Sequence, residues 1–333
     1  MLPKISILIS TYNGEKKVKR AVFSALRQTY ENIEIICLDD CSTDNTYKIL
    51  LELQRIDKRI KVFKNKTNLG IARNRNLLIN YATGEYFTFL DDDDTLTKHI
   101  CKEFISKLGT RKIDIAPFKA RIIFYSFFVM PWFCTSKINK KTNQYEYVNS
   151  SLCPPWGCFI NKKYFNSLNT PFNEKTRRFE DVGLMPYVYF CAKEFMPLNK
   201  TGYNYYKDNS HGRLSSYNNQ NATILSDEIY QVDRLLTIFK KKGFLNRKKF
   251  LRIIWSNIEQ SIGCYIGHFK PSKKYSEKLI YEKIKMEYKY LMHIKYKIPT
   301  NLKHNIWWKK IDVLFQNREY KQQNKKINQI LKK

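Results

Sequence analysis

The sequence lacks the short motifs that most often mark nucleotide or dinucleotide binding. It contains no G-x-x-x-x-G-K-S/T and no G-x-G-x-x-G, which excludes a P-loop and a dinucleotide fingerprint. A long apolar run is also missing. No uncharged stretch is longer than residues 122–136, which are broken by Pro131 and fall short of the roughly 20 residues that a spanning helix needs. The first apolar strand begins at about residue 5, so we expect neither a transmembrane segment nor a signal peptide.

Paired cysteines are absent as well. Eight cysteines are scattered along the chain, none of them in a C-x-x-C pair, and the five histidines show no zinc-site spacing beside them. Cys37 and Cys191 lie in apolar segments, where a free cysteine behaves as a small hydrophobic residue. We expect reduced, buried cysteines and a cytoplasmic protein.

Acidic side chains are scarce: 30 Asp and Glu stand against 60 Lys and Arg, which gives a formal net charge of +30. A charge of this size implies anionic partners such as nucleic acid, phosphorylated sugars or an anionic membrane surface. The excess is concentrated after residue 240. At 333 residues and 43% hydrophobic content, the chain is long enough for about two domains with a buried core.

The few acidic residues include a run of four, Asp91–Asp94, directly after the apolar, β-prone segment 85–90. Adjacent carboxylates repel one another and need a counterion. In α/β sheets, ligands bind beyond the carboxyl ends of the strands. A divalent Mg²⁺ or Mn²⁺ ion with a nucleotide diphosphate satisfies both conditions, because these cations prefer oxygen ligands. The alternative is a solvated acidic turn.

The first 110 residues alternate between apolar strands and amphipathic helices, which predicts a parallel, right-handed βαβ sheet. The helix that precedes the acidic run is predicted over residues 71–81. Polar residues cluster where strands end or helices begin. They are Ser10, Thr11, Tyr12, Asp39, Asp40 and Arg73.

Each of these residue types suits a nucleotide. The Asp40 carboxylate can accept a hydrogen bond from a base N–H, and Tyr12 offers a ring for stacking. Arg73, at a helix start, is placed to meet a diphosphate. Taken singly, Asp39 and Asp40 are also good helix caps, and Arg73 is also an ordinary surface residue.

Four motifs occur in order: I-S-I-L-I-S-T-Y-N, L-D-D-C-S-T-D-N-T, N-L-G-I-A-R-N-R-N and G-E-Y-F-T-F-L-D-D-D-D. Together they resemble the nucleotide-sugar domain of glycosyltransferase family 2, over about residues 4–108. The resemblance implies a GT-A fold, an inverting transfer from a nucleotide-diphosphate sugar, a uridine base, and a Mn²⁺ or Mg²⁺ ion at a D-x-D motif.

Carried over to this chain, the resemblance assigns roles to individual residues. Ser10, Tyr12 and Asp40 would hold the base, and Arg73 would lie near the diphosphate. Asp91 would reach toward the ribose, while Asp93 would bind the metal. The x position of the motif is here Asp92, which is therefore a second candidate for either role.

A second group of candidates follows in the acceptor half. Glu180 and Asp181 are predicted to open an amphipathic helix, and they resemble the acceptor-side E-D motif of the family. Inverting transfer needs a carboxylate base, for which Asp181 is the candidate, with Glu180 orienting it; the alternative is helix capping. Trp156 is either an aromatic platform for an acceptor sugar or a core residue.

His211 and Arg213 lie in a polar loop, about where related enzymes place His or basic residues against the diphosphate or metal. The alternative is a solvated loop. From about residue 221 the pattern becomes helical and basic, with Tyr and Trp among the lysines. Such helices suit an anionic membrane surface, although a solvated helical tail has the same composition.

We therefore predict an α/β GT-A fold with three parts: a nucleotide-sugar half (1–110), an acceptor half (111–220) and a basic helical region (221–333). The predicted function is an inverting, metal-dependent glycosyltransferase of a surface-glycan pathway such as lipopolysaccharide or capsule synthesis. Its acceptor would be a glycan or lipid-linked glycan at the inner face of the plasma membrane.

Two other classes remain as alternatives. A nucleotidyltransferase uses a similar sheet and metal, but normally carries a Gly-rich, basic loop after the first strand, where this chain has S-T-Y-N-G. A basic nucleic-acid-binding protein would explain the net charge but not the carboxylate clusters, and no nucleic-acid-binding module is present. We expect no nucleic-acid partner.

Overall fold

The computed structural model describes residues 2–124 and 154–207 throughout, the strands at 128–132, 136–139 and 144–147, and parts of 227–243. The chain divides into two compact units, residues 1–257 and 258–333. The second unit lies outside the described residues, as do His211, Arg213 and most of the predicted basic helices. The predictions for these segments, and the three-part division of the chain, stay predictions.

Residues 1–110, predicted to bind the nucleotide sugar and called the nucleotide half below, contain the predicted parallel sheet. Its strands are β1 (Ile5–Thr11), β2 (Ile33–Asp39), β3 (Ile60–Lys64) and β4 (Tyr86–Phe89). They lie in the order β3-β2-β1-β4, and every neighbouring pair is parallel. Strands β1, β2 and β4 are almost continuously buried, as expected for parallel strands that are covered on both faces.

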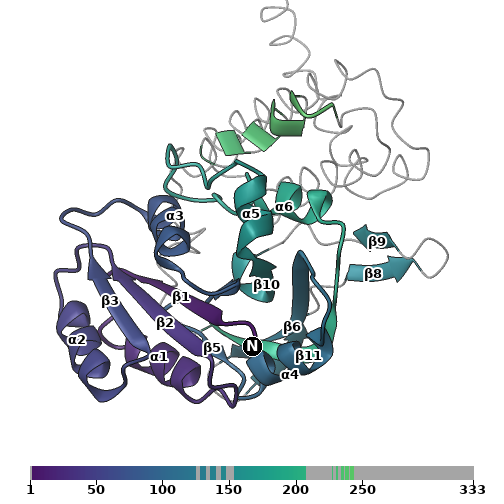
Figure 1. Cartoon of the computed structure of the whole chain (residues 1–333). Coiled ribbons are helices and arrows are strands. Elements are labelled where there is room, and N and C mark those ends of the chain that lie inside the picture. The colour runs from purple at the N-terminus through teal and green to yellow at the C-terminus, as the bar shows by residue number, and fades with distance from the viewer. Residues whose placement is uncertain are drawn as a thin grey trace, which may run out of the picture. The chain divides into compact units, whose positions relative to one another are not determined.

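Helices cover both faces of this sheet. The helices α1 (Val18–Leu26) and α2 (Thr46–Ile56) lie on one face, and α3 (Ile71–Tyr81) lies on the other (Figure 1). In α1 the buried apolar residues Val18, Ala21, Val22 and Ala25 recur at the spacing of one helix face. The observed bounds of α3 are those predicted from the sequence.

The acceptor half extends the same sheet beyond β4. The antiparallel strand β10 (Cys158–Asn161) joins β4 to β6 (Ile115–Phe124), and β6 pairs with β11 (Leu198–Lys207) and β7 (Phe128–Trp132). The short β5 (Thr95–Leu96) closes that edge. The remaining described elements are α4 (Ile100–Leu108), η1 (Pro155–Gly157), α5 (Lys162–Ser167), α6 (Met185–Cys191) and the hairpin of β8 (Ser136–Asn139) with β9 (Gln144–Tyr147).

Two local predictions in this half are wrong. The expected strand, turn and strand over residues 196–206 is one strand, β11, with irregular pairing to β6. The helix expected to open at Glu180 begins instead at Met185, with Pro186 in its first turn, so both acidic residues lie in the turn before it. A proline is tolerated only in the first turn of a helix, which explains the later start.

The chain reverses direction across the sheet between β1 and β4. From β1 it moves outward to β2 and β3, and it then returns to the other side of β1 to form β4. Open α/β sheets bind their ligands beyond the carboxyl ends of the strands, at the point where the strand order reverses in this way. The acidic run Asp91–Asp94 follows β4 at this point.

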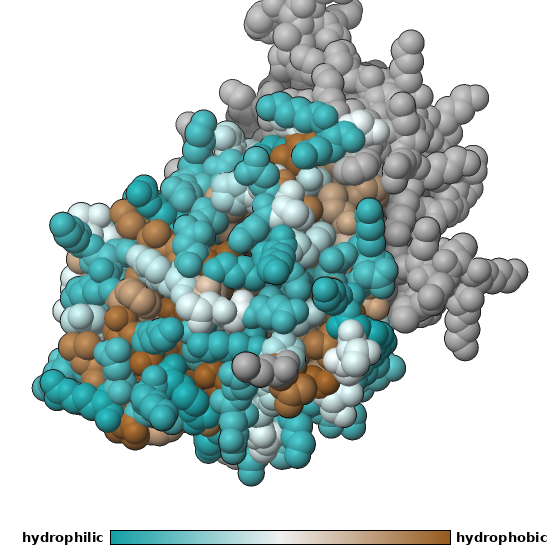
Figure 2. Space-filling view, in the orientation of Figure 1, coloured by the Kyte–Doolittle hydropathy of each residue, from teal (hydrophilic) through white to brown (hydrophobic). Residues whose placement is uncertain are grey.

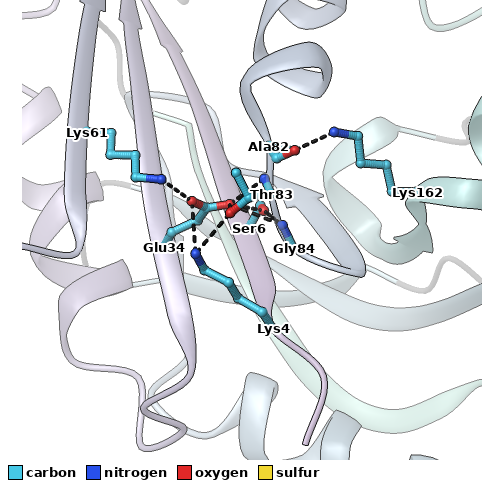
Figure 3. A network of polar contacts seen from close by, with 8 residues as sticks. All are labelled: Lys4, Ser6, Glu34, Lys61, Ala82, Thr83, Gly84 and Lys162. Carbon is cyan, nitrogen blue, oxygen red and sulfur yellow. Dashed lines mark hydrogen bonds and ion pairs between the residues drawn. The ribbon is translucent and has the colours of Figure 1, made fainter. Parts of the chain in front are cut away.

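At the opposite, amino-terminal edge of the sheet, Glu34 organises a buried polar network (Figure 3). Its carboxylate accepts hydrogen bonds from Ser6 Oγ (2.6 Å), Lys61 Nζ (2.7 Å) and the backbone N–H groups of Thr83 (2.6 Å) and Gly84 (3.1 Å). Burial by itself raises the pKa of Glu34, but the hydrogen bonds from Lys61, Ser6 and Thr83 outweigh it and lower the pKa to about 2. This network fastens β1, β2, β3 and the start of β4 together.

The surface drawn in Figure 2 is largely hydrophilic, with apolar residues in smaller patches between polar ones. None of the described helices combines the length and apolar character that crossing a bilayer requires.

Candidate active site

Thr11 and Asp92 join the ends of β1 and β4. The Thr11 hydroxyl donates a hydrogen bond to Asp92 Oδ2, at the carboxyl ends of the two strands. Gly14 packs against the same pair: a Cβ atom at this position would lie 2.5 Å from Asp92 Oδ2 and 2.6 Å from Thr11 Oγ1. Only glycine allows this close approach, so Gly14 fixes the acidic turn against β1.

The four consecutive aspartates have different environments. Asp94 is buried, and its two oxygens accept hydrogen bonds from the Tyr203 hydroxyl and the Tyr206 backbone N–H, both at 2.8 Å. Burial, followed by the nearby Asp93 and Asp91 charges, raises the pKa of Asp94. Asp92 is held by Thr11 as described. The side chains of Asp91 and Asp93 stay 33% and 32% exposed, which leaves these two available to a ligand.

Asp39 and Asp40, at the end of β2, also differ. Asp40 accepts hydrogen bonds from the backbone N–H groups of Leu69 and Gly70 and from Asn65 Nδ2, each at 2.8 Å, so both of its oxygens hold the turn that leads into α3. Asp39 is also buried. Its Oδ2 accepts from the Ser42 N–H (3.1 Å), whereas its Oδ1 has no hydrogen-bond partner among the residues that the structure describes. A buried carboxylate oxygen without a partner is a costly arrangement that a bound donor would relieve.

The other predicted nucleotide residues lie at the same edge. Ser10 Oγ accepts from Asn74 Nδ2 of α3 (3.1 Å). Tyr12 is one of the few exposed large aromatic residues in the described part of the chain. The side chain of Arg73 is 53% exposed, and its Nη1 lies 3.8 Å from Glu174 Oε2. Its predicted contact with a diphosphate stays a prediction.

Arg75, which the sequence analysis passed over, lies at the centre of the site. Its side chain is only 7% exposed, and its guanidinium donates from Nη1 to Glu180 Oε1 and from Nη2 to Asp91 Oδ1 (3.3 Å). The periodicity of α3 gives a signal for this position. Arg75 is three residues after Ala72 and three before Leu78, and all three residues lie on the buried face of the helix. A buried arginine requires a carboxylate partner.

Glu180 and Asp181 face this arginine from the turn before α6. Phe179, just before them, has φ of 60°, an uncommon conformation for a bulky residue that marks a sharp, strained turn. Glu180 is buried, whereas Asp181 is partly exposed and accepts from the Val182 N–H (2.9 Å). Burial raises the pKa of both carboxyl groups, and the charge of Arg75 opposes this rise.

Residues 6–168 match the family model described as Glycosyl transferase family 2. This segment of the protein belongs to the family. Among its relatives are the glycosyltransferase GlyG of Streptococcus pneumoniae serotype 4, 28% identical over 60% of this chain and 70% of GlyG, and a processive diacylglycerol beta-glycosyltransferase of Mycoplasma pneumoniae, 27% identical over 72% of this chain and 73% of that protein. The chain is therefore a glycosyltransferase.

A second similarity is shorter but closer in sequence identity. The UDP-Glc:alpha-D-GlcNAc-diphosphoundecaprenol beta-1,3-glucosyltransferase WfaP of Escherichia coli is 46% identical over 90 residues, which are 27% of this chain and 35% of WfaP. The crystal structure of S. aureus TarS 1-349 in complex with UDP-GlcNAc matches with a TM-score of 0.58 at 19% identity, over 83% of each chain. This likeness confirms the GT-A fold.

The donor set of this family 2 glycosyltransferase fits a hard divalent cation. Asp91 and Asp93 present oxygen ligands, and burial together with the Asp91 charge raises the pKa of Asp93. Lys17 Nζ lies 3.8 Å from Asp93 Oδ2. The described residues contain no group of three or more His, Cys, Asp or Glu side chains that could hold a metal ion.

Trp156 is the predicted site residue whose environment departs most from the expected role. Its ring is buried and stacks on Tyr203, with 4.2 Å between the ring centroids, and Tyr205 lies 6.0 Å away. This is the packing of the core alternative. Acceptor binding by Trp156 stays a prediction that would need the ring to become exposed.

Proposed function

We propose that this glycosyltransferase transfers a sugar, with inversion, from a UDP-sugar to a hydroxyl group of a glycan or lipid-linked glycan. The observation that carries the proposal is the placement of Glu180 and Asp181. Arg75 holds Glu180 against Asp91, at the carboxyl ends of β1 and β4, and Asp181 follows Glu180 in the same turn. A carboxylate pair for the acceptor therefore lies beside the carboxylates proposed for the donor.

The donor would bind along the carboxyl edge of the sheet. Asp39 Oδ1, which has no partner in the described part of the chain, would accept from the N–H of the base in place of the predicted Asp40. Tyr12 would stack on the base, Asp91 would meet the ribose, and Arg73 would approach the diphosphate. Asp93 would hold a Mn²⁺ or Mg²⁺ ion, which when bound stabilises the negative charge of the leaving diphosphate.

Asp181 would act as the general base. The acceptor oxygen attacks the anomeric carbon while its proton passes to the Asp181 carboxylate. The bond from that carbon to the diphosphate oxygen breaks, and the nucleoside diphosphate leaves from the opposite face, which inverts the configuration. Asp181 is partly exposed and so is reachable by an acceptor, whereas the buried Glu180 is fixed by Arg75 and orients its neighbour.

The acceptor class rests on relatives and on charge. The names of two relatives, WfaP and the GalNAc(5)-diNAcBac-PP-undecaprenol beta-1,3-glucosyltransferase of Campylobacter jejuni, specify lipid-linked glycan acceptors. A net charge of +30 suits work at an anionic membrane surface, on the cytoplasmic side, in the synthesis of a surface glycan such as lipopolysaccharide or capsule. Co-sedimentation with anionic vesicles that is unchanged by truncation after residue 220 would argue against membrane binding through the basic region.

The donor proposal is tested by thermal unfolding with UDP, GDP, CDP and TDP, each with and without Mn²⁺. A ligand that binds only the folded state raises the melting temperature. We expect the largest rise with UDP plus Mn²⁺. An equal response to all four nucleotides, or to none, would contradict a uridine-specific, metal-assisted donor site.

A further inference from the structure

We infer that Arg75 is a positioning residue, whose guanidinium joins the donor-side Asp91 to the acceptor-side Glu180 and thereby fixes the catalytic base Asp181 relative to the donor. This inference rests on the proposed function. It adds a role for a residue that is not itself expected to touch either substrate, because its two terminal nitrogens are already engaged by the two carboxylates.

The contacts of Arg75 span the two halves of the fold. Asp91 is 16 residues away in the sequence and Glu180 is 105 residues away, yet both bind the same guanidinium. The centre of that group also lies 5.5 Å from the Phe89 ring, at the end of β4, and 5.8 Å from the Phe172 ring, in the acceptor half. Each half therefore supplies one carboxylate and one aromatic ring to the arginine.

Asn76 strengthens the same junction. Its Nδ2 donates to the Phe172 carbonyl and its Oδ1 accepts from the Phe172 N–H, both at 2.9 Å. The segment that leads to Glu180 is thus fastened to α3 by two hydrogen bonds, directly beside Arg75. Because the backbone is held in this way, replacing Arg75 alters the junction without releasing the whole segment.

A lysine cannot reproduce the geometry. The planar guanidinium presents separate N–H groups to two carboxylates at once, whereas an ammonium is a single compact charge on a flexible stem. The site also depends on the charge of Arg75, because three carboxylates (Asp91, Glu180 and Asp181) act on this one cation. Arg75→Lys moves the positive charge away from the buried Glu180 and the partly exposed Asp181, and both carboxyl groups then retain their protons to higher pH.

The test compares Arg75→Lys with Arg59→Lys and Arg73→Gln. Arg59 is a matched control: it binds Asp57 through Nε and Nη2, with Nη2 at 2.8 Å, in the turn before β3 and away from the site. The assays are UDP binding by calorimetry, the rate of UDP release from UDP-glucose and UDP-GlcNAc across pH, and a ¹³C-carboxyl NMR titration of Glu180, assigned with Glu180→Gln.

For Arg75→Lys we expect kcat to fall by about tenfold to a hundredfold, because small displacements of a catalytic group have effects of this size, while the Kd for UDP changes less than about threefold. The acidic limb of the kcat profile and the Glu180 titration both move to higher pH. Arg59→Lys leaves all three measurements unchanged, and Arg73→Gln weakens UDP binding without moving the pH profile.

The inference is overturned if Arg75→Lys lowers only the melting temperature or the active fraction, with the wild-type pH profile and Glu180 titration retained. A wild-type protein that neither binds UDP nor releases it from a donor contradicts the proposed function instead. In that case the NMR titration still decides whether Arg75 governs the charge of the carboxylate pair.

Discussion

The Tyr203 hydroxyl donates a hydrogen bond to Asp94 Oδ2 over 2.8 Å, and this contact separates Asp94 from the other aspartates of the acidic run. With its second oxygen bound to the Tyr206 N–H, Asp94 joins the acidic turn to β11. Asp91, Asp92 and Asp93 are all partly exposed, and of these three Asp92 accepts the hydrogen bond of the Thr11 hydroxyl. Adjacent aspartates of the acidic run therefore have different environments: Asp94 is bound within the fold, whereas Asp91 and Asp93 are the carboxylates proposed to bind ligands.

Substitutions within the run should separate these positions. Asp93→Ala should abolish the Mn²⁺-dependent part of UDP binding and leave the melting temperature of the free protein nearly unchanged. Asp94→Ala should lower the free energy of unfolding by about 1–3 kcal/mol, because it leaves the buried Tyr203 hydroxyl without its acceptor. Calorimetry with and without Mn²⁺ measures UDP binding, and urea denaturation measures the free energy of unfolding. Loss of Mn²⁺-dependent UDP binding in Asp94→Ala but not in Asp93→Ala would assign the metal to Asp94.

Substitution of Asp39 and Asp40, at the end of β2, should affect UDP binding and stability differently. Asp39→Asn should weaken UDP binding by about tenfold or more, since a charged acceptor for the base is lost. Asp40→Asn should instead lower the melting temperature, because Asp40 holds the Leu69 and Gly70 N–H groups. A larger loss of UDP affinity in Asp40→Asn, at unchanged stability, would restore Asp40 as the residue that binds the base.

The Glu34 network predicts how stability depends on pH. The pKa of Glu34 is about 2 in the folded protein, against an ordinary value of 4.5. A carboxyl group with a lowered folded-state pKa stabilises the protein above its unfolded pKa, and this contribution is lost as the pH falls from about 5 toward 2. The contribution at neutral pH is on the order of 3 kcal/mol.

Glu34→Gln should therefore reduce the free energy of unfolding at pH 7 and flatten its decline between pH 5 and 2. Urea denaturation across this range, beside the wild type, provides the measurement. Because the network lies at the edge opposite the site, UDP binding by the folded variant should be unchanged. Parallel pH curves for the two proteins would show that Glu34 titrates normally in the folded state.

The stereochemistry of transfer can be examined without the natural acceptor. If water replaces the acceptor hydroxyl, an inverting enzyme releases β-glucose first from UDP-α-glucose, and the α anomer appears later by mutarotation. Proton NMR at early times distinguishes the two anomers. Initial formation of α-glucose would mean retention, and Asp181 would then not be acting as a simple general base.

The nucleotide half of the fold could be predicted because its information is local. Each of its strands is a short apolar run, each helix has the spacing of one buried face, and the bounds of α3 were predicted correctly. The acceptor half depends on pairing between distant strands, such as β10 with both β4 and β6, which no local pattern specifies. The late start of α6 did have a sequence signal, since Pro186 suits only a first turn.

The site was predicted less evenly. The motifs located its edge, but the roles of the four aspartates depend on partners as distant as Thr11, Lys17, Arg75 and Tyr203. The acidic run itself looks uniform in the sequence. Arg75 could have been found by placing the two arginines of R-N-R on a helical wheel, because only the second shares the buried face of Ala72 and Leu78.

The most direct test of the central claim is the kinetics of Asp181→Asn, measured as UDP release from UDP-glucose and UDP-GlcNAc together with the Kd for UDP. Asp57→Asn, a carboxylate away from the site, is the control. We expect the kcat of Asp181→Asn to fall by about 10²-fold to 10⁴-fold, which is the usual effect of removing a general base. Its Kd for UDP should stay within about twofold of the wild-type value. Full turnover in Asp181→Asn, or equal loss of turnover and UDP binding, would contradict the assignment of Asp181 as the base.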